Sequence, residues 1–168
     1  MKKTFTIIGL ALLLSFITIN ASAQKNQVTV FDGEMTWSSF SYANVMVAND
    51  DKGNPVLWAP ILQTQIGNSL RSVSFSVLTC EPGVYSATFN AATQKWSSPV
   101  IVNVILNVDY DGELYPTWRG QSATLTIHKY NKKKKRIDAT LNAVVVMDGT
   151  NKTRTIKIVM EDLDVSGK

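Results

Sequence analysis

The last third of the chain alternates between apolar and polar residues, which is the pattern of strands that bury one face. Apolar side chains fall on every second position over 123–127, 137–147 and 156–160. A basic turn over 130–135 separates the first two segments, and a turn at Asp148-Gly149 separates the last two. Asp-Gly accepts positive φ at low steric cost. The pattern therefore predicts three long antiparallel strands in consecutive hairpins.

Leu163 lies out of phase with the alternation over 156–160. One extra residue in a strand moves every following side chain to the other face. We therefore predict a bulge, or the end of the strand, near Glu161 and Asp162.

Shorter strand-like segments precede this closing stretch, and turn sequences separate them at intervals of about 8 to 12 residues. Asp32-Gly33 interrupts the first segment as a bulge or a tight turn, and Pro60 bends a later one. No window of the mature chain has a helical period with a capping signal. The sequence predicts an all-β antiparallel meander of about nine or ten strands, closed as a lipocalin-like barrel or folded as a two-sheet sandwich. The expected segments are 28–37, 43–48, 56–66, 71–78, 84–89, 100–108 and 114–118.

The amino terminus has the features of a secretory signal. Lys2 and Lys3 precede an apolar run over 7–19, and Ala21-Ser22-Ala23 forms an Ala-x-Ala cleavage site. The run is too short for a permanent membrane span, and no Cys for lipid attachment follows it. We predict a signal peptide over 1–23, export to the periplasm or the extracellular space, and no stable membrane insertion.

A single β domain is expected over residues 24–168. These 145 of the 168 residues carry 15 basic and 13 acidic side chains, a net charge of +2. A chain of this size buries about 70% of the surface that its unfolded form exposes. Cys80 is the only cysteine, so no internal disulfide forms, and its setting after Val77-Leu78-Thr79 favours a small buried side chain over a nucleophile.

The closing hairpin also resembles that of a family of secreted or lipid-anchored all-β domains common in gut-type Gram-negative bacteria. The similarity rests on Ala123 to Asn131, Lys135-Arg136-Ile137 and Ala139-Thr140-Leu141, all within the hairpin over 122–141. A weaker similarity links Phe31-Asp32-Gly33 and Trp37 to the opening strand of that family. The family carries no established catalytic residues, so the resemblance implies a fold and an exported location and no site.

Lys132 to Arg136 place five cations in one turn. Such a cluster attracts anionic surfaces, such as lipopolysaccharide phosphates or nucleic acid. The interpretation that we favour is a solvated hairpin tip whose charge discourages edge pairing. Export and the small net charge argue against nucleic acid as a partner.

Asp109, Asp111 and Glu113 are weak candidates for a metal site, because hard cations such as Ca²⁺ prefer several oxygen ligands. Their spacing does not match a calcium-binding loop, and an Asp-Gly hairpin turn explains the same residues. We therefore predict no metal site and no cofactor.

Aromatic residues are the best candidates for ligand contact. Trp96 and Trp118 lie beside predicted loops, with Tyr115 nearby, whereas we expect Trp37 and Trp58 in the core. An indole at a loop offers a large apolar face, suited to a sugar or the mouth of a cavity, with only two torsions to immobilise.

The sequence gives little support to catalysis. It has no Gly-x-Ser-x-Gly, no His-Glu-x-x-His, no glycine-rich phosphate loop, and a single histidine, His128. The leading hypothesis is a non-enzymatic exported domain that binds a small or glycan-like ligand, or a partner protein, near Trp96 and Trp118. One alternative is an envelope assembly subunit that pairs through sheet edges. A weaker alternative is a two-carboxylate glycosidase.

Overall fold

The computed structural model describes residues 27–38, 44–109 and 117–166. This part of the chain forms eleven strands and contains no helix, which confirms the all-β prediction and adds one strand to the expected nine or ten. The strands are β1 (Gln27–Phe31), β2 (Thr36–Ser38), β3 (Asn44–Asn49), β4 (Pro55–Ile66), β5 (Ser69–Val77), β6 (Gly83–Asn90), β7 (Lys95–Trp96), β8 (Ile101–Asp109), β9 (Trp118–Asn131), β10 (Arg136–Met147) and β11 (Thr153–Asp164). None of the described residues belongs to a helix long and apolar enough to cross a membrane.

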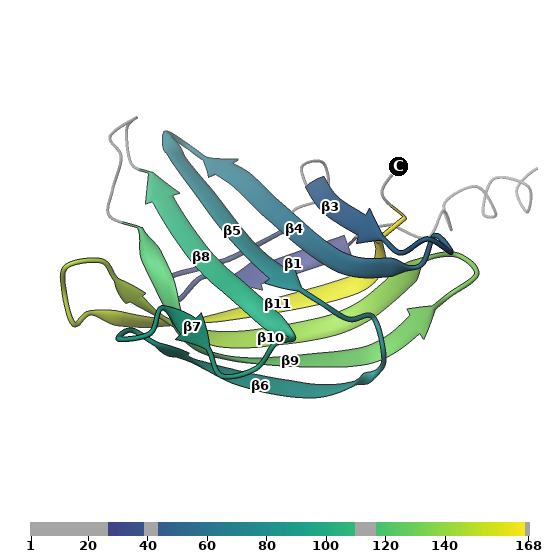
Figure 1. The fold of residues 1–168 in the computed structure, drawn as a ribbon. Coiled ribbons are helices and arrows are strands. Elements are labelled where there is room, and N and C mark those ends of the chain that lie inside the picture. Colours follow the sequence, from purple (N-terminus) through teal and green to yellow (C-terminus); the bar gives the residue numbers. More distant parts are fainter. Residues whose placement is uncertain (1–26, 39–43, 110–116, 167–168) are drawn as a thin grey trace, which may run out of the picture.

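The strands form one strongly curled antiparallel sheet, in a barrel-like arrangement (Figure 1). Its hydrogen-bonded order is β2-β1-β11-β10-β9-β8-β5-β4-β3. Two meanders, β3 to β5 and β8 to β11, account for most of this order. They join where β5 pairs with β8, which leaves the β6–β7 hairpin outside the main path.

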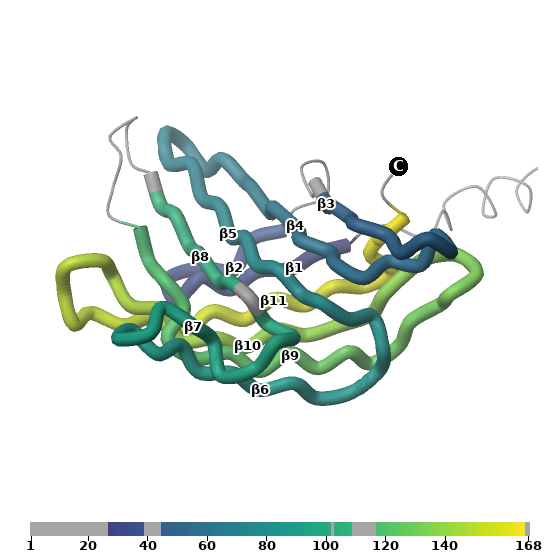
Figure 2. Tube along the Cα trace, in the orientation of Figure 1, coloured from purple at the N-terminus to yellow at the C-terminus, as the bar shows by residue number. Residues whose placement is uncertain are grey.

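Strand β9 divides its pairing between two neighbours. Its first residues, Trp118 and Arg119, pair with β8, whereas Ser122–Ile127 pair with β6. The β9–β10 register shifts beside Gln121, which is the extra residue of a bulge. Bulges bend a strand and raise its twist. Strand β8 therefore leaves β9 after a short ladder, and β6 lies along the freed edge (Figure 2).

The closing stretch has the predicted two hairpins. Lys135 at φ 50° ends the basic turn, and Gly149 at φ 74° lies in the Asp-Gly turn. The expected bulge is present, because the β10–β11 register shifts between Ile137 and Ala139 and Asp162 adopts φ 51°. Leu163 is thereby returned to the buried face.

Two earlier irregularities also have a defined form. Asp32-Gly33 is a tight turn between antiparallel β1 and β2, which is one of the two alternatives that the sequence left open. Pro60 lies inside β4, and the β4–β5 ladder is interrupted between Trp58 and Ile61. The interruption follows from the missing N–H of proline.

The inward side chains of the curled sheet form one apolar core. They come from every long strand, and they are mainly branched aliphatic residues together with four large aromatic residues, Trp37, Trp58, Phe75 and Trp118. Trp58 meets Phe75 edge to face at 5.8 Å between ring centroids, and its Nε1 donates to the carbonyl oxygen of Thr79 at 2.7 Å. The largest fully buried side chains are Trp58, Phe75, Leu62, Ile101, Leu106, Leu125, Ile137, Leu141, Ile156, Ile158, Met160 and Leu163.

Candidate functional site

Several residues that the sequence proposed lie outside the described part of the chain or carry no metal-site geometry. Tyr115, Asp111 and Glu113 are outside the described residues, and Asp109 is described only as the last residue of β8. Among the described residues, no three His, Cys, Asp or Glu side chains are close enough to hold a metal ion. The structure therefore adds no support for a cation site.

Trp118 is 4% exposed on the inward face of β9. The guanidinium carbon of Arg154, from β11, lies 4.3 Å from its ring centroid. A cation over an indole face is attracted by the ring quadrupole. Trp118 is thus covered by a charged side chain rather than presented to solvent.

Arg154 is part of a partly buried ionic network that was not predicted from the sequence. Its centre is Asp32, which is 0% exposed in the β1–β2 turn. One carboxylate oxygen of Asp32 accepts the backbone N–H groups of Glu34 and Met35, each at 3.1 Å. The other accepts Nε1 of Trp37 at 3.0 Å and Nη1 of Arg71 at 2.5 Å.

Glu34 links the two arginines of this network. Its carboxylate accepts Nη2 of Arg71 at 2.9 Å and also forms an ion pair with Arg154. Arg71 is 3% exposed on β5, which is not a hydrogen-bonded neighbour of β1 or β2. The network therefore connects opposite parts of the curled sheet through its interior, and we call it the ionic brace.

The brace lowers the pKa of Asp32. Burial by itself raises that pKa, but the hydrogen bonds from Arg71, the backbone of Met35 and Glu34, and Trp37 outweigh burial. Asp32 is therefore ionised in the folded protein at neutral pH. The balanced charges and the burial fit a structural role.

Trp96 is half-buried in β7 and packs against the core. Its ring centroid lies 5.7 Å from that of Phe89 on β6. A Cβ placed on Gly120 would lie 2.8 Å from Cη2 of Trp96 and 2.9 Å from Cβ of Val104. The absence of a side chain at Gly120 is therefore what lets Trp96 cover the place where β8 and β9 diverge.

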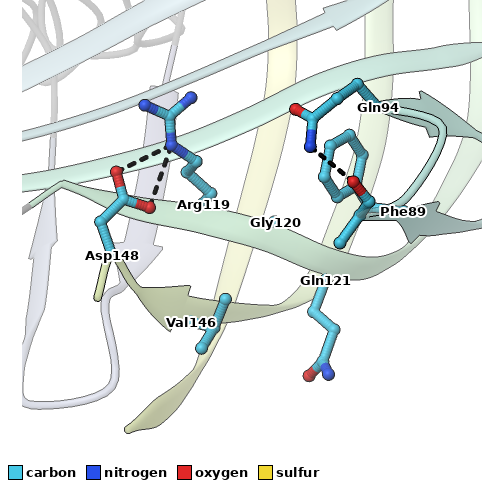
Figure 3. A pocket seen from close by; sticks show the side chains of 8 residues that line it. Phe89, Gln94, Arg119, Gly120, Gln121, Val146 and Asp148 are labelled. Atoms are coloured by element: carbon cyan, nitrogen blue, oxygen red, sulfur yellow. Dashed lines mark hydrogen bonds and ion pairs between the residues drawn. The ribbon is translucent and has the colours of Figure 1, made fainter. Parts of the chain in front are cut away.

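A surface pocket of about 420 Å³ lies beside Trp96, at the end of the sheet where the β6–β7 and β10–β11 turns meet β9 (Figure 3). Its volume is in the usual range for small ligands, about 300–1,000 Å³. Phe89 supplies an aromatic face, and Gln94 and Gln121 supply amides. The lining residues are Phe89, Ala91, Gln94, Arg119, Gly120, Gln121, Val146 and Asp148.

Two interactions fix the polar side chains of this pocket. Nε of Arg119 donates to both carboxylate oxygens of Asp148, at 3.0 and 2.8 Å. On the other side, Nε2 of Gln94 donates to the carbonyl oxygen of Ala91 at 2.7 Å, and Gln94 adopts φ 55°. A positive φ is unfavourable for a residue with a Cβ, so this turn places a polar amide where glycine would fit with less strain.

The pocket lies beside Trp96, but none of its described lining residues is one of the ligand-binding residues predicted from the sequence. Trp96 contacts Phe89, which lines the pocket, and Trp118 is next to Arg119 in β9. Sequence reasoning missed Phe89, Gln94, Arg119 and Asp148. They come from three separate segments, and no local motif marks residues that only the curl of the sheet brings together.

The remaining candidates lie away from this pocket. Lys132 to Lys134 are exposed at the β9–β10 turn, at the opposite end of β9. Cys80 is buried, and burial first, then the charge of Glu81, raises the pKa of its thiol to about 11. His128 is exposed and its Nε2 lies 2.9 Å from Oγ1 of Thr140.

No protein-family model, curated protein or solved structure matches the chain.

Proposed function

We propose that this protein is an exported, non-enzymatic β domain that binds a glycan-like ligand in the pocket between Phe89 and Arg119. The supporting observation is that one pocket joins an aromatic face to fixed hydrogen-bonding groups. Sugars present apolar C–H faces and a rim of hydroxyl groups. A ring for stacking and amide or ionic groups for the hydroxyls are the complementary chemistry.

Binding fits this pocket better than glycoside hydrolysis. Most glycosidases need two carboxylates that face the scissile bond. Asp148 is the single carboxylate among the described lining residues, and both of its oxygens accept Nε of Arg119. The described lining therefore lacks the second carboxylate that this reaction needs.

Fluorescence titration of the mature protein with a panel of oligosaccharides and lipids tests this function. Trp96 lies against Phe89, so a bound ligand should change its emission, and thermal stability should rise with ligand concentration. Phe89→Leu should weaken binding by about 0.5–1.5 kcal/mol, the usual contribution of an aromatic contact beyond its area. Phe31→Leu is the matched control, since it makes the same change at an exposed phenylalanine of β1 that does not line the pocket.

Two results would count against the proposal. The first is the absence of any saturable response across the panel together with an unchanged melting temperature. The second is a Phe89→Leu variant that binds as tightly as the Phe31→Leu control.

Strand β3 supports a second candidate function, assembly through a sheet edge. It ends the strand order among the described residues and contains neither a charged residue nor a proline, the usual protections of an edge. Met46 on this strand is 59% exposed. We infer that β3 pairs with β3 of a second copy. Met46→Lys should then weaken dimerisation, as measured by sedimentation velocity. A protein that is monomeric at all concentrations excludes this assembly.

A further inference from the structure

Arg119 has a defined orientation at the edge of the pocket. Asp148 accepts Nε of Arg119 with both carboxylate oxygens, and this ion pair joins β9 to the turn between β10 and β11. The two terminal nitrogens of the guanidinium point away from Asp148 (Figure 3). Within the described part of the chain they have no hydrogen-bond partner, and the Arg119 side chain is 62% exposed.

These two nitrogens form a planar pair of donors. A guanidinium binds a carboxylate by two parallel N–H···O bonds, a geometry that a lysine ammonium cannot reproduce. Asp148 already occupies the Nε side of Arg119, so an incoming carboxylate would bind the two terminal nitrogens of the guanidinium. Phe89 and Gln94 lie on the other side of the pocket, where they would contact the rest of the ligand (Figure 3).

The described segments around the pocket are positively charged. Residues 89–96, 117–121 and 146–153 contain Lys95, Arg119 and Lys152 against one acid, Asp148, which gives a net charge of +2. Lys95 and Lys152 are both exposed. Neither lysine lines the pocket, but cations on the segments that form it favour an anionic ligand over a neutral one of the same shape.

We propose that the ligand is an acidic sugar, whose carboxylate binds the terminal nitrogens of Arg119 while its ring lies against Phe89. This inference rests on the proposed glycan-binding function and adds the charge of the ligand and the residue that selects it. Arg119 is then a specificity-determining residue, and Asp148 is a positioning residue that holds it.

A matched pair of probes tests the inference on the mature protein, namely a disaccharide of galacturonic acid and its methyl ester. The two probes have nearly the same shape, and the ester lacks the charge. We expect the acid to bind about tenfold more tightly than the ester, in line with a charge-assisted hydrogen bond. The Kd of each probe is measured by isothermal titration calorimetry.

Variants of Arg119 locate the source of this preference. Arg119→Gln should abolish the difference between the two probes, and Arg119→Lys should retain only part of it, because the charge stays and the planar fork is lost. Lys133→Gln is the control, because it removes one exposed cation at the far end of β9. It should leave the preference unchanged.

Each outcome decides between defined alternatives. Equal binding of acid and ester by the wild type overturns the inference and leaves glycan binding intact. A preference that persists in Arg119→Gln, or disappears in Lys133→Gln, shows that general electrostatics rather than Arg119 selects the ligand. Failure of both probes to bind, when other sugars do, also overturns the inference, and failure of every sugar overturns the proposed function as well.

Discussion

Replacing Arg71 by methionine tests whether the ionic brace holds the curled sheet together. Arg71 is 3% exposed and its guanidinium donates to Asp32 at 2.5 Å and to Glu34 at 2.9 Å. Methionine fills a similar apolar volume and removes both charged contacts. Asp32 would keep three donors but would remain buried without its cation.

The expected cost is large relative to the stability of a small domain. Removing one partner of a buried ion pair destabilises a protein by about 3–5 kcal/mol, because the other charge stays desolvated and unpaired. Small domains unfold with only about 5–15 kcal/mol. For a domain of about 150 residues, the melting temperature should fall by about 6–20 °C.

The pH dependence of this loss has a definite sign. The pKa of Asp32 is lower in the folded protein than in the unfolded chain, so its ionisation stabilises the fold above about pH 4. This contribution disappears as the pH falls through the folded-state pKa. Without Arg71 the pKa of Asp32 rises, so acid protonates Asp32 in the variant and removes its unpaired buried charge. The difference in unfolding free energy between wild type and variant should therefore become smaller at low pH.

Urea unfolding, followed by tryptophan fluorescence and circular dichroism between pH 3 and 7, measures both effects. Asp148→Asn is the control, since it breaks an exposed ion pair and should cost about 1 kcal/mol or less. A double variant, Asp32→Asn with Arg71→Met, should be less destabilised than the sum of the two single variants. A loss below about 1 kcal/mol for Arg71→Met, or one that is constant with pH, would refute the structural role of the brace.

Three further predictions concern packing and turn geometry. Gly120→Ala should destabilise the fold by about 1–3 kcal/mol and shift the emission of Trp96, because the added Cβ would lie 2.8 Å from the indole; an unchanged melting curve would contradict this packing. Gln94→Gly should change the unfolding free energy by no more than about 1 kcal/mol, because the relief of backbone strain at φ 55° offsets the lost hydrogen bond to the carbonyl oxygen of Ala91. The same variant should weaken glycan binding in the fluorescence titration. Cys80 should react with a thiol reagent at pH 8 only when the protein unfolds, because burial raises its pKa to about 11, and rapid labelling of the native protein would disprove its burial.

The candidate site could be predicted from the sequence less completely than the strands. The loop end beside Trp96 and Trp118 was predicted because indoles next to turn sequences are visible in the sequence. The roles of the two rings were not, since Trp118 lies beneath Arg154, which is 36 positions away, and Trp96 lies against Gly120. Side chains that meet across a curled sheet leave no local pattern.

The sequence by itself determined most of the strands, with their inward faces and turns, although β7 lies outside the expected segments. Alternation with a period of two depends only on the geometry of each strand, and positive φ depends on the local residue, so both were readable at Gly149 and at the bulge before Leu163. Only the tertiary structure decided the strand order, the brace between Asp32 and Arg71, and the pocket around Arg119. These features depend on how far the sheet curls, and the curl is a property of all the strands together.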